Sequence, residues 1–152
     1  MVAIQFIYIL SLVVWIGGIV FFSFFTAPAV FKTLDRQKAG EVVGVIFPRY
    51  YALGYVCCIL SITALLIAGG GVISLQLVFL AAMAGCTFYS GRVIGPRAKN
   101  LKEEIKSQDN PEQKDALKSR FDKIHTLSVR LNGAVLALGL GVLWLTAGGM
   151  KL

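Results

Sequence analysis

Residues 50–91 read YYALGYVCCILSITALLIAGGGVISLQLVFLAAMAGCTFYSG and contain no charged side chain. A transmembrane helix needs about 20 mostly apolar residues, so this stretch is long enough for two. Three consecutive glycines, at positions 69–71, divide it near the middle. Since glycine readily adopts turn conformations, the stretch predicts two antiparallel membrane helices joined by a tight turn.

The distribution of charge extends this pattern to the whole chain. All eight acidic residues and fourteen of the fifteen basic residues lie within 32–49 and 92–130; only Lys151 lies outside. Charge inside a bilayer is costly, and 57% of the residues are hydrophobic. The sequence therefore predicts an all-α, integral membrane four-helix bundle forming one domain, with a cytoplasmic helical extension between helices three and four. The expected spans are about 2–28, 48–69, 72–94 and 127–148, and the helical hairpin covers about 96–126.

Orientation follows from the same distribution. Short loops rich in lysine and arginine stay cytoplasmic, and both charged stretches fall on one side of a four-span protein. We expect a multi-pass protein of the cell (inner) membrane with both termini outside. Topology then accounts for the net charge of +7, so nucleic acid is not an expected partner, whereas anionic lipid headgroups are.

Prolines and caps predict the helix ends. Pro28 should end the first helix, because proline lacks the backbone N–H. Residues 36–46 should form a short interfacial helix, and Pro48 should occupy the first turn of the second span. Gly95 and Pro96 should bend the third. Asn110 should cap a long fourth helix that begins at position 111. Apolar residues at helical spacing on this helix should pack against those of the helix that follows Pro96; they are Leu101, Ile105, Leu117, Phe121 and Ile124.

The spans lack most catalytic groups. They contain no aspartate or glutamate, and the chain has one histidine. These absences disfavour an ion-coupled pump, an ATPase, a hydrolase and a haem held by two histidines of one chain. No catalytic residue and no cofactor can be assigned.

Three cysteines form one candidate site. Cys57 lies 14 residues before Gly71 and Cys86 lies 15 after it, so the two should share a depth. Thiolates favour soft metals such as Cu(I), Zn(II) or Hg(II). Neighbours on a helix point about 100° apart, so at most one of Cys57 and Cys58 faces Cys86. Free cysteines also serve as small packing residues, which is the alternative.

Cationic and polar residues near the charged edge form a second candidate site. Converging arginines can hold a phosphate or a carboxylate, although snorkelling and topology also place arginines there. Ser128 and Asn132 continue a polar stripe from His125 into the membrane. The candidate ligand-binding residues are Arg49, Arg92, Arg97, His125, Ser128, Arg130 and Asn132. A stripe of small residues at 133, 137 and 141 favours close packing within the bundle or a homo-oligomer.

Five phrases in order carry a family resemblance: Trp15-Ile16-Gly17-Gly18, Ala27-Pro28 with Phe31, Phe47-Pro48 with Tyr50, Gly95-Pro96-Arg97, and Phe121 with His125, Leu127, Ser128 and Asn132. The chain resembles the transmembrane protein 205-like family of small four-helix membrane proteins. The resemblance highlights Trp15, Gly17, Pro28, Pro48, Pro96, Arg97, His125 and Ser128. It also implies a link to platinum-drug resistance, in which sulfur residues have been proposed to matter.

The sequence leaves three functions open. The first is a non-enzymatic membrane protein that handles a small ligand, such as a soft metal or metal complex. The second is an interaction or assembly subunit of a membrane complex. The third is an enzyme that acts on a lipid or porphyrin at the cytoplasmic edge.

Overall fold

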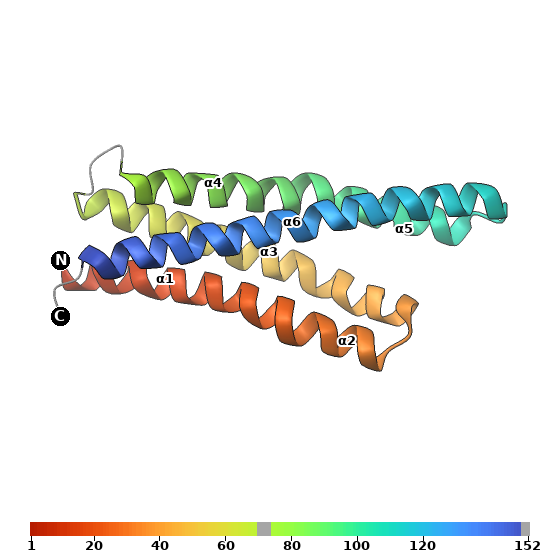
Figure 1. Cartoon of the computed structure of the whole chain (residues 1–152), viewed down its shortest axis with the longest axis horizontal. Coiled ribbons are helices and arrows are strands. Elements are labelled where there is room, and N and C mark those ends of the chain that lie inside the picture. The colour runs from red at the N-terminus through yellow and green to blue at the C-terminus, as the bar shows by residue number, and fades with distance from the viewer. Residues whose placement is uncertain (70–73, 150–152) are drawn as a thin grey trace.

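The computed structural model describes residues 1–69 and 74–149, and within these ranges every regular element is helical (Figure 1). The expected all-α class is therefore confirmed for this part of the chain. The elements are α1 (Val2–Phe21), η1 (Phe22–Thr26), α2 (Ala27–Thr33), α3 (Arg36–Ile67), α4 (Leu75–Tyr89), η2 (Ser90–Ile94), α5 (Gly95–Ser107) and α6 (Pro111–Gly149), where η denotes a π-helical turn.

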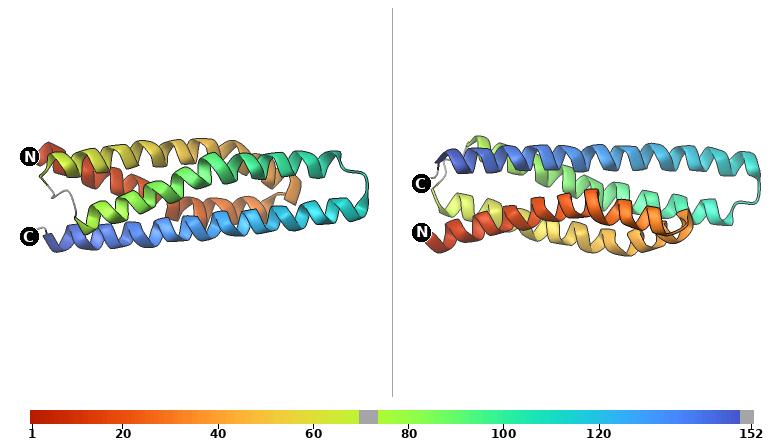
Figure 2. Two further views of the ribbon diagram at one scale, coloured as in Figure 1. Left: turned by 90° about the horizontal axis from the view of Figure 1, so that it is seen from above. Right: turned by 60° about the horizontal axis from the view of Figure 1, so that its bottom comes forward.

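Four helical segments in the described ranges are long and apolar enough to cross a membrane: Val2–Thr33, Gln37–Ile67, Leu75–Ser107 and Pro111–Gly149. Successive segments run in opposite directions, so the start of α1 and the end of α6 lie at the same end of the bundle (Figure 2). The 39 residues of α6 correspond to about 58 Å of helix, well beyond the roughly 30 Å of a bilayer core. Four such segments suggest a multi-pass membrane protein, and the last helix is longer than a bilayer core is thick.

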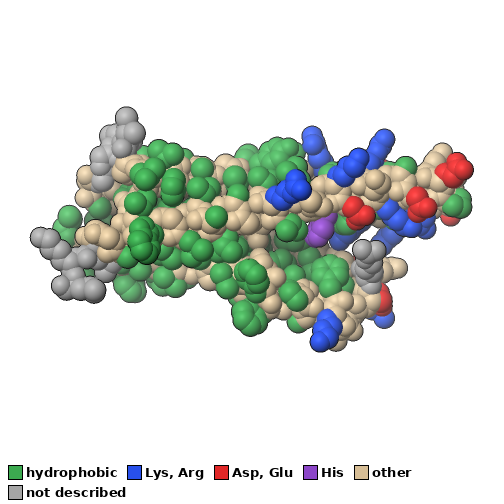
Figure 3. Space-filling view, viewed as in Figure 1, with side chains coloured by type: hydrophobic (Ala, Val, Ile, Leu, Met, Phe, Trp, Pro, Cys, Tyr) green, Lys and Arg blue, Asp and Glu red, His purple; other side chains and the backbone are tan. Residues whose placement is uncertain are grey.

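Apolar side chains fill the bundle and also cover its outside. Leu12, Ile19, Leu80 and Val142 are fully buried between the helices. Trp144, by contrast, is 81% exposed on the outer surface. On the face that Figure 3 shows, hydrophobic side chains are spread over one part of the molecule, while lysine, arginine and acidic side chains gather toward the other end. An outer surface of this kind suits contact with lipid rather than water.

Polar side chains cap the helices that start at the charged end. The backbone N–H of Lys38 donates to Asp35 Oδ1 at 3.0 Å, which begins α3. This bond lowers the pKa of the Asp35 carboxyl below its ordinary value. The backbone N–H of Glu112 donates to Asn110 Oδ1 at 3.0 Å, so the predicted cap of the fourth helix is confirmed.

In the first and third segments, a π-helical turn precedes the proline. The helix continues past Pro28, so the predicted end at that residue is wrong. The N–H of Ala27 donates five residues back to Phe22 O, and that of Gly95 donates five back to Ser90 O. Each π turn ends two residues before a proline, Pro28 or Pro96. Proline clashes with the carbonyl four residues earlier, and the wider π turn displaces that carbonyl. The helix therefore continues to Thr33.

The second segment is one helix, whereas the sequence predicted an interfacial helix over residues 36–46 and a new start at Pro48. Pro48 lies inside α3, and its ring leaves the carbonyl of Gly44 without its helical donor. Ala39 and Val43 are buried, so packing against the rest of the protein holds the first turns in line. The helix ends at Ile67, and Gly69 adopts φ 77°, the left-handed conformation typical of a glycine after a helix. The rest of the predicted glycine turn, residues 70 and 71, lies outside the described residues.

The expected helical hairpin beyond Pro96 is present as α5 and the first part of α6. Leu101, Ile105, Leu117, Phe121 and Ile124 are half-buried, as expected for two packed arms. Lys102 Nζ donates to Gly40 O at 3.0 Å and lies 5.5 Å from the centre of the Phe121 ring. Lys106 Nζ pairs with Glu41 Oε1 at 2.9 Å. These contacts connect the hairpin to α3.

Candidate functional site

Six neutral polar residues lie between the four segments near the charged end of the bundle. We call them the polar cluster: Ser23, Tyr50, Tyr51, Ser90, Ser128 and Asn132. The hydroxyl of Tyr50 donates to Asn132 Oδ1 at 2.5 Å, and Asn132 Nδ2 donates to Ser23 Oγ at 3.0 Å. The hydroxyls of Tyr51 and Ser128 lie 3.5 Å apart. Asn132 thus links α6 to both α3 and η1.

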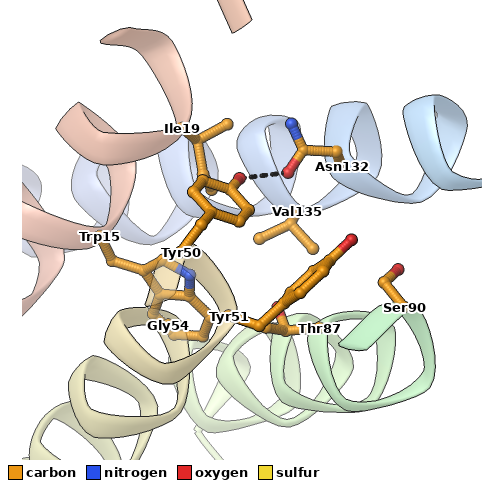
Figure 4. Close-up of a pocket in the computed structure, with 9 residues that line it drawn as sticks. All are labelled: Trp15, Ile19, Tyr50, Tyr51, Gly54, Thr87, Ser90, Asn132 and Val135. Atoms are coloured by element: carbon orange, nitrogen blue, oxygen red, sulfur yellow. Dashed lines mark hydrogen bonds between the residues drawn. The ribbon is translucent and has the colours of Figure 1, made fainter. Parts of the chain in front are cut away.

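A small cavity of about 10 Å³ lies inside this region (Figure 4). Its wall consists of Trp15, Ile19, Tyr50, Tyr51, Gly54, Thr87, Ser90, Asn132 and Val135. A cavity of this size holds about one water molecule. Hydroxyl and amide groups face it from three segments, so it offers several hydrogen-bonding partners. A larger ligand would have to replace contacts between the helices.

Aromatic rings surround the polar groups on the α3 side. The rings of Phe22 and Tyr50 have centroids 5.1 Å apart. Those of Phe47 and Tyr51 stack at 5.8 Å with an interplanar angle of 16°. Aromatic walls with a few placed polar groups resemble the lining of small-molecule sites, which enclose about 300–1,000 Å³, far more than this cavity does.

The two π turns supply the serines of the cluster. Ser23 lies in η1 and Ser90 in η2. Because a π turn contains more residues than an α turn, it rotates the residues before it relative to those after it. π turns inside α-helices occur frequently at functional sites. A proline follows each of these turns, and both prolines belong to the phrases that carry the family resemblance.

Two glycines allow the aromatic rings to approach. A Cβ atom on Gly54 would lie 3.2 Å from Trp15 Nε1 and 3.1 Å from Thr87 Cγ2. A Cβ atom on Gly91 would overlap the hydroxyl of Tyr55. That hydroxyl is buried without a hydrogen-bond partner within the described part of the chain. The region between α3 and η2 is therefore closely packed around polar groups.

The predicted arginines lie at the surface. Arg49, Arg92, Arg97 and Arg130 are all exposed. The Nη1 atom of Arg49 donates to its own helix, at Val45 O, over 3.2 Å. Arg49, Arg92 and Arg130 lie within two positions of a cluster residue but point elsewhere, because residues one or two apart on a helix face different directions.

Of the predicted polar stripe, the structure brings Ser128 and Asn132 into the cluster and leaves His125 outside. His125 is exposed, and its ring is parallel to that of Phe121 at 6.2 Å, with an interplanar angle of 7°. Ser128 and Asn132 are half-buried. The stripe therefore divides into an outer histidine and an inner pair.

The three thiols belong to the apolar interior. Cys57 is 3% exposed, and Cys58 and Cys86 pack against the same core. Across residues 1–69 and 74–149, no group of three or more histidine, cysteine or acidic side chains is placed to hold a metal ion. The geometry gives these cysteines a packing environment.

Ser23, Tyr51 and Ser90 are not among the site residues predicted from the sequence. Tyr50 and Trp15 entered only through the family resemblance. One signal was available: Ser23 and Ser90 precede Pro28 and Pro96 by five and six residues. Read with the tendency of proline to disturb the preceding turn, that spacing marks both serines.

Comparison with known proteins gives the relationship of the chain. Residues 10–107 match the model of a family described as Domain of unknown function (DUF4149). The chain belongs to this family. It is also 33% identical over 121 residues to an uncharacterized protein of Aquifex aeolicus (strain VF5), covering 80% of each chain. No solved structure matches.

The family match covers most of the cluster but not all of it. Trp15, both π turns and the tyrosines of α3 lie within residues 10–107. Ser128 and Asn132 on α6 lie beyond that range. The hydrogen-bond partner of Tyr50 thus comes from outside the part of the chain that the family model describes.

Proposed function

We propose that this member of the DUF4149 family is a non-enzymatic membrane protein that binds a small ligand at the polar cluster. The observation that carries the proposal is the bond chain from Tyr50 through Asn132 to Ser23. Buried polar side chains are expensive in a membrane interior and mark functional pathways. Packing alone would not require polar side chains from all four segments to meet at the same depth.

The orientation and the neighbouring lipids are part of the proposal. The charged end faces the cytoplasm of the cell, because fourteen of fifteen basic residues lie there. The exposed arginines Arg49, Arg92, Arg97 and Arg130 then contact anionic lipid headgroups. The ordered phrases also support the finer relationship to the transmembrane protein 205-like proteins.

The chemistry of the cluster favours a hydrogen-bonding ligand over a soft metal. Its donors are oxygen and nitrogen atoms, whereas soft metals prefer thiolates. The soft-metal hypothesis makes a separate prediction: Hg(II) binds the purified protein, and Cys86→Ala weakens that binding sharply. Equal binding by wild type and by Cys86→Ala, measured by elemental analysis after dialysis, would reject a shared site.

Native mass spectrometry of the protein, purified in a mild detergent, tests the ligand. Wild type is expected to retain a small molecule that Asn132→Leu loses. Thr63→Val serves as the matched control, because Thr63 is exposed on α3 and lies outside the cluster. Adducts that are identical in all three proteins, or missing from wild type, would argue against binding at the cluster.

A second candidate is an assembly subunit, which one observation favours. Gly133 and Ala137 are exposed, and a Cβ atom on Gly133 would meet nothing within 4 Å. Of the two glycines in the predicted stripe, Gly141 has a near neighbour, the ring of Phe79, and Gly133 has none. Exposed small residues permit close approach of another helix. Disulfide trapping of Gly133→Cys in membranes tests a symmetric dimer, and a cross-linked band is expected only if the two copies meet there.

A further inference from the structure

The polar wall of the cavity is electrically neutral. Its hydrogen-bonding groups come from Tyr50, Tyr51, Thr87, Ser90 and Asn132. None of these side chains is ionised at neutral pH. Each is at least half-buried, so a charge placed among them would lose most of its hydration without gaining an opposite charge.

The charges nearest in sequence turn away from this wall. Arg49 precedes Tyr50, Arg92 follows Ser90 by two positions, and Arg130 precedes Asn132 by two, yet all three arginines are exposed. The guanidinium of Arg49 is bonded to Val45 O rather than to a cluster residue. The fold therefore keeps positive charge at the surface while directing neutral groups inward.

We infer that the site selects an uncharged ligand that carries hydrogen-bonding groups. This inference rests on the proposed function and adds the class of ligand. Both hydrogen-bonding roles are available, because Asn132 and the hydroxyls can each donate or accept. The aromatic rings of Trp15, Tyr50 and Tyr51 suit the apolar part of such a molecule.

Trp15 provides a reporter inside the site. The chain has two tryptophans, and Trp144 is 81% exposed. In a Trp144→Phe protein reconstituted in vesicles, the fluorescence comes from Trp15 alone, which is 4% exposed and lines the cavity. The probes are acrylamide, an uncharged amide, and iodide, an anion, each present on both sides of the membrane.

Because the cavity holds about one water molecule, acrylamide must displace contacts between the helices to reach Trp15; it is expected to do so and to quench Trp15, whereas iodide is expected to have no effect. Two variants made in the Trp144→Phe protein separate entry through the site from general penetration. Asn132→Leu fills the site, and Thr87→Val removes a hydroxyl with little change of volume. Both should reduce quenching by acrylamide, with helix content unchanged by circular dichroism; Thr87→Val keeps the test available if Asn132→Leu does not fold.

The other results are equally decisive. Quenching by both probes would overturn the selection for uncharged ligands and leave the proposed site standing. Quenching by neither would overturn the site and the proposed function together. Quenching by acrylamide alone that persists unchanged in Asn132→Leu and Thr87→Val would show entry by another path and overturn the inference.

Discussion

Gly139 and Gly133 lie on the same helix, yet alanine at these two positions should have opposite effects. Gly139 is buried. A Cβ atom there would lie 2.9 Å from Ile16 Cγ1, 3.1 Å from Ile16 Cδ1 and 3.2 Å from Met83 Cε. Favourable carbon contacts begin at about 3.5 Å. The first contact is to an atom in the middle of the isoleucine side chain, so the whole side chain must move.

The magnitudes follow from two opposing effects. Alanine in place of glycine favours a helix by about 0.5–1 kcal/mol, whereas overpacking a filled core costs about 1–3 kcal/mol. Gly139→Ala should therefore lower the free energy of unfolding by up to about 2.5 kcal/mol. At Gly133 no atom lies within 4 Å of the added carbon, so only the gain in helix stability remains.

Reversible unfolding in mixed detergent micelles, followed by circular dichroism, measures both variants under one condition. Gly139→Ala should unfold at a lower denaturant fraction than wild type, and Gly133→Ala at an equal or higher one. A stabilised Gly139→Ala protein, or equal shifts for both, would mean that α1, α4 and α6 do not meet as described.

Three further predictions concern the cluster, the charged end and the topology. In a double-mutant cycle of Tyr50→Phe and Asn132→Leu, unfolding in micelles should give a coupling energy of about 0.5–1.5 kcal/mol. A value near zero would mean that the hydrogen bond between these two side chains is absent from the native state. Asp35→Ala should speed amide hydrogen exchange in the first turn of α3. The pKa of Asp35 is lowered in the folded protein. The cap is therefore present above the ordinary carboxyl pKa and is lost as the pH falls through the folded value. Wild type should lose this protection in acid, and Asp35→Ala should show no such pH dependence. Finally, Lys114→Cys in intact cells should resist an impermeant thiol reagent, and ready labelling would reverse the proposed orientation.

Much of the fold could be predicted because charge and length decide it. A bilayer excludes ionised side chains, so the uncharged runs mark helices without any knowledge of their packing. The helix ends were harder to predict. Pro28 and Pro48 look like boundaries to a rule about single prolines, but a π turn accommodates the first and tertiary packing holds the second.

The site was partly predictable for a different reason. Asn132 stood out as an amide inside an apolar run, and it is central to the cluster. Counting along a helix gives depth but not the direction in which a side chain points. Arg49 and Tyr50 have almost the same depth, yet one faces outward and the other faces Asn132. Tyr51 could not be distinguished from the aromatic residues on the outer surface until the neighbouring helices were in place.

The π turn at Phe22–Thr26 determines how this helix should respond to the loss of a single residue. Such a turn corresponds to one residue inserted into an otherwise regular α-helix. Deleting a single residue between positions 22 and 26 should therefore restore a plain α turn and leave the faces of α1 and α2 in their native directions. Most one-residue deletions in a helix rotate everything beyond them by about 100°. Here the deletion should keep the faces of α1 and α2 in register, but it should also restore the clash between Pro28 and the carbonyl four residues earlier and displace the hydroxyl of Ser23 from Asn132.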